Sequence, residues 1–255
     1  MFIDTHAHIY IDRFKDDLDK VINRSLEQKV TQILMPNIDV VSMDDVVETA
    51  KNYPDVCKPM VGLHPCSVND NWKEDLNQLK PYLNDDGVIA VGEIGMDLYW
   101  DKTFASAQEE AFRHQISWAK ELGLPIVIHS RAAIDITIDI VSKLQDGSLK
   151  GVFHCFDQSY EHGQKIIDTG FYIGLGGVIT YKKNNDIREA IRQLPMSAIL
   201  LETDSPYLPP VPYRGKRNES SYIPIVAERL SQIKDISIEE VARITTENAK
   251  TLFGL

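Results

Sequence analysis

The sequence lacks any apolar run long enough to cross a bilayer, so a membrane-spanning helix is not expected. Its N-terminus also lacks a basic segment followed by an apolar one. Strand-like residues begin at Met1, which leaves nothing to serve as a cleavable signal. We therefore expect a cytoplasmic protein without a membrane partner.

Cysteine is scarce, with Cys57, Cys66 and Cys155 widely spaced and no Cys-x-x-Cys pair. An odd number of such thiols argues against a disulfide framework and is typical of a reducing compartment. Positive charge is also in deficit, because the formal net charge is −11. This balance opposes non-specific binding to nucleic acid, so a polyanionic substrate would need a local patch of positive charge or bound metal.

Linkers, low-complexity tracts and short-period repeats are absent too, which predicts a single domain over 1–255 and a monomer without an obligate protein partner. Short apolar runs without strict alternation are present instead, and this is typical of parallel strands buried on both faces. Eight such runs predict strands at 2–5, 32–35, 58–62, 88–92, 125–128, 150–153, 172–175 and 198–201.

Amphipathic segments separate these runs and predict helices at 14–29, 41–52, 73–83, 106–122, 132–145, 160–168, 185–193, 223–233 and 238–252. The last begins with a capping box, Ser237-Ile-Glu-Glu240, and has Gly254 beyond its end. Eight strand–helix units in a chain of this length predict an α/β fold of the (β/α)₈ TIM-barrel type. An open doubly wound sheet is the alternative, because local pattern does not show closure.

Residues that can bind metal end or follow several of the predicted strands. In a barrel the carboxyl ends of the strands meet at one mouth, so closure would bring these side chains together. Taken singly, each also fits a turn, a cap or a core position. Taken together, they would be costly to bury without a partner. The six residues are His6, His8, Glu93, His129, His154 and Asp204.

Six ligands are too many for one tetrahedral zinc but suit two adjacent ions, which Glu93 could bridge with its two oxygens. Four histidines and two carboxylates favour Zn, Mn, Fe, Co or Ni over Mg on affinity, and the identity stays open. Two divalent metal ions generate a bound hydroxide near neutral pH, so the implied chemistry is hydrolysis.

Five motifs carry a family resemblance: Phe-Ile-Asp-Thr-His-Ala-His (2–8), Gly-Leu-His-Pro (62–65), Gly-Glu-Ile-Gly-Met-Asp (92–97), Pro-Ile-Val-Ile-His-Ser-Arg (125–131) and Leu-Leu-Glu-Thr-Asp-Ser-Pro (200–206). In this order, over essentially the whole chain, they resemble the TatD-type metal-dependent deoxyribonucleases of the amidohydrolase-like barrel superfamily. The resemblance implies a TIM-barrel hydrolase that cleaves DNA phosphodiesters with divalent metal, often as an exonuclease.

Position by position, the resemblance implies two metal sites that share Glu93. The first holds His6, His8 and Asp204, and the second holds His129 and His154. Glu93 and Asp204 are the predicted catalytic residues, and Asp204 could also take the proton from the attacking water. His64, Arg131 and Arg214 are the implied substrate-binding residues.

The chain departs from the family pattern at Tyr10, where an acidic or amide residue is common, and at Met96 and Leu98. We expect these changes to affect substrate preference rather than the ligands. Around Arg214, the cluster with Lys216 and Arg217 could contact a DNA backbone. Aromatic residues after the strands could stack on bases, among them Tyr99, Trp100, Tyr181 and Tyr207.

Two further functions remain open from the sequence. A small-molecule amidohydrolase or lactonase on the same barrel agrees with the acidic balance, but such enzymes often bridge their metals with a modified lysine where Glu93 stands here. A metal-binding or scaffold protein without turnover is the other.

Overall fold

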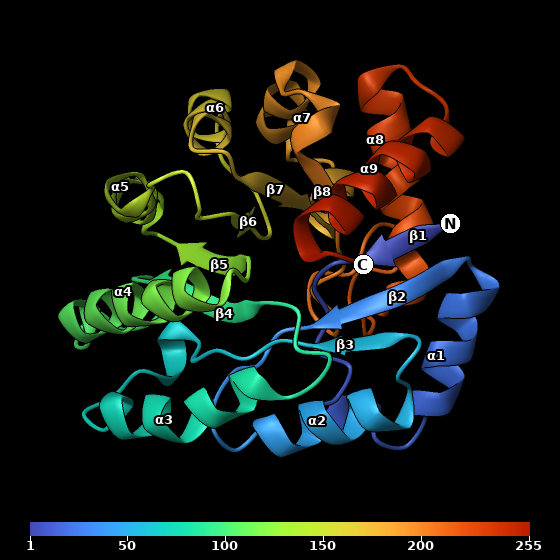
Figure 1. Ribbon diagram of the computed structural model, residues 1–255. Helices are drawn as coiled ribbons and strands as arrows, with labels where there is room; N and C mark the ends of the chain where they lie inside the picture. The colour runs from blue at the N-terminus through green and yellow to red at the C-terminus, as the bar shows by residue number, and fades with distance from the viewer.

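The computed structural model describes residues 1–255 and contains eight parallel strands surrounded by helices (Figure 1). One sheet has the order β1-β2-β3 and the other has the order β4-β5-β6-β7-β8. The strands are β1 (Phe2–Asp4), β2 (Val30–Met35), β3 (Cys57–Pro59), β4 (Val91–Asp97), β5 (Ile126–Arg131), β6 (Gly151–Phe153), β7 (Tyr172–Leu175) and β8 (Ile199–Leu201).

Backbone contacts join the two sheets at both edges. Val61, just after β3, bridges to Val91 of β4, and Ala7, just after β1, bridges to Ser205 after β8. At the second junction the Thr5 amide donates to the Leu201 carbonyl at 3.0 Å. The strands therefore form a ring, and the α/β barrel prediction is confirmed.

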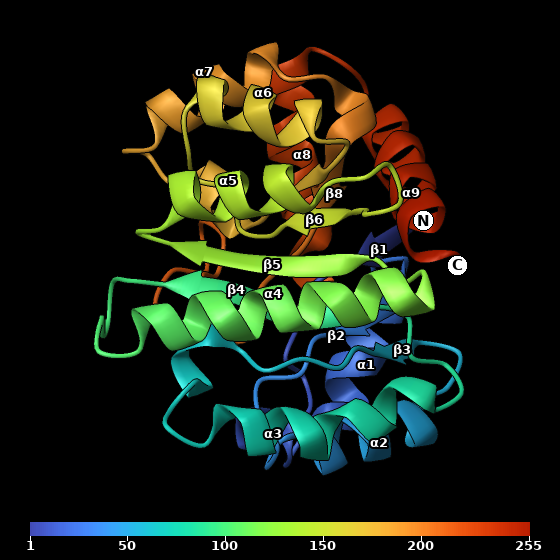
Figure 2. The same ribbon diagram turned by 60° about the vertical axis from the view of Figure 1, so that its left-hand side comes forward.

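Nine α-helices lie around the outside of this ring (Figure 2). They are α1 (Leu18–Glu27), α2 (Met43–Asn52), α3 (Trp72–Leu79), α4 (Ala105–Leu122), α5 (Ile134–Leu144), α6 (Tyr160–Asp168), α7 (Asn185–Gln193), α8 (Ile223–Lys234) and α9 (Ile238–Phe253). Half of the predicted capping box is present, because the Glu240 amide donates to the Ser237 hydroxyl at the start of α9, while the Glu240 carboxylate accepts from Arg243 instead of the Ser237 amide. No helix has the length and hydrophobicity needed to span a membrane.

Two strands run further than the sequence predicts. β4 continues to Asp97 and β5 to Arg131, so Glu93 and His129 lie within their strands rather than at the ends. The pairing of these strands has an irregularity between Val91 and Ile94 and then resumes. The glycines of this segment interrupt the apolar pattern, which is why the pattern ends early while the backbone pairing does not.

Helix α9 closes the barrel interior at the amino-terminal end of the strands. Ile3, Leu34, Val127 and Leu200 come from different strands and belong to one buried cluster, which they can form only inside the ring. Leu252 and Phe253 of α9 complete that cluster. With this end filled, the opposite end of the ring is left for polar side chains.

Gly95 of β4 lies against the backbone of His129 in β5. Its φ is +142°, and a Cβ at this position would lie 2.0 Å from the His129 carbonyl oxygen. We expect Gly95→Ala to reduce the free energy of unfolding by about 3 kcal/mol, because overlap and backbone strain add. Urea denaturation measures this.

Gly176→Ala is the matched control, since a Cβ there would make only ordinary contacts at 3.5 Å or more. It should change the free energy of unfolding by no more than about 0.5 kcal/mol. Equal midpoints for the two variants would contradict the close approach of β4 and β5.

Candidate metal centre

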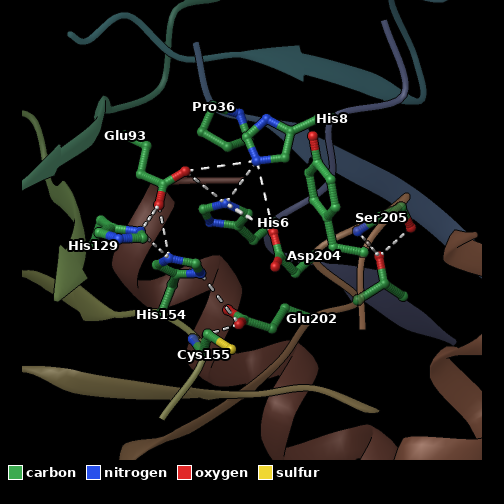
Figure 3. Close-up of polar contacts among 12 residues, drawn as sticks. His6, His8, Pro36, Glu93, His129, His154, Cys155, Glu202, Asp204 and Ser205 are labelled. Atoms are coloured by element: carbon green, nitrogen blue, oxygen red, sulfur yellow. Dashed lines mark hydrogen bonds and ion pairs between the residues drawn. The ribbon is translucent and has the colours of Figure 1, made fainter. Parts of the chain in front are cut away.

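The structure brings the six predicted ligands together at the carboxyl end of the barrel (Figure 3). Parallel strands all direct their carboxyl ends to the same side, so residues far apart in the sequence meet there. Four of the six side chains are well buried, while His129 and Asp204 are partly exposed. The six are His6 and His8 after β1, Glu93 in β4, His129 in β5, His154 after β6 and Asp204 after β8.

The first half of the centre is built on the two histidines after β1. His6 Nε2 lies 3.3 Å from His8 Nε2 and 3.1 Å from Glu93 Oε2. Asp204 Oδ1 lies 3.8 Å from His6 Nε2 and 3.7 Å from His8 Nε2. Two imidazole nitrogens and two carboxylate oxygens therefore face one small volume.

The second half lies at the other oxygen of Glu93. Glu93 Oε1 is 2.8 Å from His129 Nδ1 and 2.7 Å from His154 Nε2. Those two nitrogens are 3.3 Å apart. Each oxygen of Glu93 thus faces its own pair of histidines, as expected of a carboxylate that bridges two ions.

The donor set fits divalent cations. Burial lowers the pKa of His8 to about 3, so the ring is neutral and its nitrogen lone pair is free. Burial acts to raise the pKa of Glu93, but interactions with the surrounding histidines, His154 first, outweigh it and hold that pKa well below its usual range. An ionised carboxylate among imidazoles is a suitable set for transition metals, and His6, His8 and Glu93 form one of the groups that could hold an ion.

Two neighbouring side chains fix the orientation of these histidines, and the sequence analysis gave neither this role. Asp97 Oδ2 lies 3.0 Å from His129 Nε2, which leaves Nδ1 facing the centre. The Tyr10 hydroxyl donates to the Pro36 carbonyl and lies 3.0 Å from His8 Nδ1. It therefore accepts the Nδ1 proton of His8 and leaves the Nε2 lone pair free.

A signal for Asp97 was present in the sequence, because Glu93 and Asp97 share one face of an extended strand. No comparable signal existed for Tyr10. The sequence analysis placed Tyr10 among residues that affect substrate preference, whereas the structure shows it buried against His8.

His64 is placed to donate a hydrogen bond into the centre. Its Nδ1 accepts from the Cys66 amide at 3.0 Å, and burial lowers its pKa to about 3. The neutral ring therefore carries its proton on Nε2, which lies 3.2 Å from His129 Nδ1 and 3.6 Å from Glu93 Oε1. A protonated nitrogen is not a metal ligand, so this geometry favours contact with water or substrate.

The three basic residues after β8 do not act as one cluster. Arg217 donates to both oxygens of Asp17 and to the Arg13 carbonyl, so its guanidinium is already paired within the fold. Arg214 stacks on Tyr181 with its guanidinium 4.0 Å from the ring centroid. The prediction of a joint basic contact is wrong for Arg217, because Asp17 binds that side chain.

Arg131, the last residue of β5, makes a similar stacked contact. Its guanidinium is 4.1 Å from the Tyr99 ring centroid and 5.1 Å from that of Trp100. Arg131 and Arg214 are both exposed. Neither takes part in an ion pair, so both guanidinium groups keep their hydrogen-bond donors available.

A cleft of about 540 Å³ adjoins the centre at Asp97. Trp100, Phe104 and Cys66 contribute to its walls, and three further carboxylates line it, those of Asp39, Asp75 and Asp101. The cleft is thus open to a substrate but repels anions.

The sequence is similar to a family of metal-dependent hydrolases over its whole length. The family profile described as "TatD related DNase" matches residues 3–254. The uncharacterized metal-dependent hydrolase YabD of Bacillus subtilis is 39% identical over 255 residues, covering 100% of both chains. The uncharacterized metal-dependent hydrolase YcfH of Escherichia coli is 34% identical, covering 99% of this chain and 96% of its own.

A solved structure agrees with the fold. The TatD homolog YjjV from Escherichia coli superposes with a TM-score of 0.94 at 30% identity, covering 100% of this chain and 98% of its own. A TatD family hydrolase from Entamoeba histolytica, at 24% identity and a TM-score of 0.88, shares the same fold.

Asp97→Asn tests the orientation of His129. The amide is a weaker acceptor and can present its NH₂ to the ring, so we expect the affinity for Mn²⁺ to fall about 10- to 100-fold. Isothermal titration calorimetry of the metal-depleted protein measures it. Asp97 Oδ1 accepts from the Tyr99 and Trp100 amides, and the oxygen of an asparagine can keep both bonds, so the melting temperature without metal should change little. An unchanged affinity would mean that Asp97 does not orient His129.

Proposed function

Because the chain belongs to the family of TatD-related DNases, we propose that it is a metal-dependent hydrolase that cleaves phosphodiester bonds of DNA. The convergence of four histidines and two carboxylates on one mouth supports the hydrolase. The observation that carries the choice of a phosphodiester is the pair of stacked, unpaired arginines beside the centre. In a chain with a net charge of −11, free guanidinium groups at the mouth suit a phosphate backbone.

We assign two ion positions to the centre. His6, His8 and Asp204 would hold the first ion and His129 and His154 the second, with one oxygen of Glu93 on each. Divalent ions bound there would activate water and neutralise charge on the phosphoryl oxygens.

The remaining steps fall to side chains of this chain. His64 would donate its Nε2 proton to a phosphate oxygen. Asp204 would accept the proton of the attacking water. Burial raises the pKa of this carboxyl to about 6, against the opposing attraction of His154 and His6, and a base with a pKa near the working pH is effective in proton transfer.

Glu93→Gln is the direct test of the bridging carboxylate. Loss of its charge should lower turnover of end-labelled single-stranded DNA at least about 10³-fold, because both ion positions lose a ligand. Stability without metal should fall as well, because His129 and His154 lose the charge of their buried partner, so circular dichroism must show that the variant is folded. EDTA should reduce the wild type to the same rate. Wild-type turnover in the variant would exclude the bridging role.

Arg131→Ala and Arg214→Ala test contact with the DNA backbone. We expect each to lower kcat/KM on DNA about 10-fold while leaving metal content unchanged, since one charged hydrogen bond is lost. Each should also reduce the salt dependence of DNA binding by about one ion.

Lys51→Ala is the charge-matched control for both arginines. Lys51 is exposed in the last turn of α2, and helices in this fold run back from the mouth to the other end of the barrel. If Lys51→Ala changes kcat/KM as much as Arg131→Ala, the arginines act only through net charge.

The acidic cleft beside Asp97 favours a second candidate, a hydrolase of a small uncharged ester or cyclic amide. A substrate panel separates the two. Metal-dependent turnover of lactones or dihydropyrimidines with no cleavage of DNA would select the small-molecule hydrolase and reject the nuclease.

A further inference from the structure

A second buried carboxylate, Glu202, lies on the far side of the histidine rings from Glu93 (Figure 3). Its Oε1 accepts from the Cys155 amide at 2.5 Å and lies 3.5 Å from His154 Nδ1. Its Oε2 is buried without a hydrogen-bond partner. Oε1 of this carboxylate thus accepts a hydrogen bond, while Oε2 accepts none.

Two histidine nitrogens near Glu202 are likewise buried without a hydrogen-bond partner. The rings of His6 and His154 stack with centroids 4.0 Å apart and an angle of 10° between their planes. Both direct Nε2 toward Glu93, and in both the opposite nitrogen, Nδ1, is buried without a partner. His6, His154 and Glu202 offer polar atoms that lie within 4.8 Å of one another. Such buried unpaired groups cost about 1–3 kcal/mol each, so a partner is required.

The chemistry of the ring defines what that partner must be. If Nε2 of each histidine binds an ion, as proposed above, the ring proton lies on Nδ1 and both Nδ1 atoms become donors. A cation between them is excluded, because two N–H protons would point at it. An acceptor is required, and the free oxygen of Glu202 is the one at hand.

We propose that Glu202 is the shared acceptor behind both histidines, with Oε1 accepting the Nδ1 proton of His154 and one ordered water linking Oε2 to the Nδ1 proton of His6. The water accepts from His6 and donates to Glu202. This inference rests on the proposed ion positions but not on the substrate.

Gly174 of β7 supports this arrangement. A Cβ at this residue would lie 2.1 Å from Glu202 Oε2, so only glycine leaves room for the carboxylate in its observed position. A side chain here would cover the oxygen whose acceptor capacity is unused.

The consequence is that one residue acts on both ion positions. His6 belongs to the first position and His154 to the second, so Glu202 connects them from behind as Glu93 does from the front. Glu202 is therefore a positioning residue, because it acts through the ligands and does not contact the ions.

Glu202→Gln tests the proposal, with Glu219→Gln as the control. Glu219 is equally a buried carboxylate, but it pairs with Arg24 at 2.6 Å. We expect Glu202→Gln to lower the Mn²⁺ affinity of both equivalents about 10- to 100-fold in calorimetric titration of the metal-depleted full chain. Glu219→Gln should lower the melting temperature without changing either affinity.

The outcomes are distinct. If Glu202→Gln binds both Mn²⁺ equivalents with wild-type affinity, the proposal is overturned. If the variant binds only one of the two equivalents more weakly, the water link to His6 is overturned. These titrations contain no DNA, so a failure to cleave DNA would reject the nuclease and leave this inference standing.

If Glu202→Gln does not fold, the ring protons of His6 and His154 in the wild type can still test the proposal. In Zn²⁺-loaded protein labelled with ¹⁵N-histidine, His6 and His154 should both carry their protons on Nδ1 and exchange them slowly with solvent. A proton on Nε2 of either ring, or exchange at the rate of a free imidazole, would overturn the proposal.

Discussion

Backbone pairing between the start of the chain and the segment after β8 is the constraint on which the candidate centre depends. The Asp204 amide donates to the His6 carbonyl at 2.9 Å, and the His8 amide donates to the Ser205 carbonyl at 2.8 Å. Asp4 reinforces the junction, because its carboxylate accepts hydrogen bonds from the amide and the hydroxyl of Thr203. Ligands from opposite ends of the sequence are thereby held in fixed register, which side-chain contacts alone would not achieve.

The centre is an electrostatic balance in which each charge is stabilised by the others. Glu93 is buried and ionised because imidazoles surround it, and the imidazoles keep their orientation because hydroxyl and carboxylate acceptors hold their outer nitrogens. The acidic surface does not contradict an anionic substrate under these conditions. Arg131 and Arg214 rest on aromatic rings rather than on carboxylates, so their positive charges are not neutralised by ion pairs although the cleft beside Asp97 is acidic.

Much of this structure is predictable from sequence because it depends on local pattern. The bounds of α6 and α7 follow directly from amphipathic spacing, and the start of α9 follows from its capping serine, Ser237. The six ligands are predictable because strand order determines which residues share the mouth. The extension of β4 is not, since it depends on pairing with β5 across an irregularity. The roles of Tyr10 and Glu202 are not, because they arise from contacts between segments far apart in sequence.

The same junction between β1 and β8 also affects how the centre is assembled during folding. His6 and His8 are made first during synthesis, yet their partner Asp204 follows β8, so the complete centre requires a contact of very high sequence separation. Contacts of this kind carry a large loop-closure entropy cost, which slows folding. The first ion position therefore stays incomplete in a nascent chain until β8 has docked, whereas the residues of the second, Glu93, His129 and His154, all come from β4 to the segment after β6.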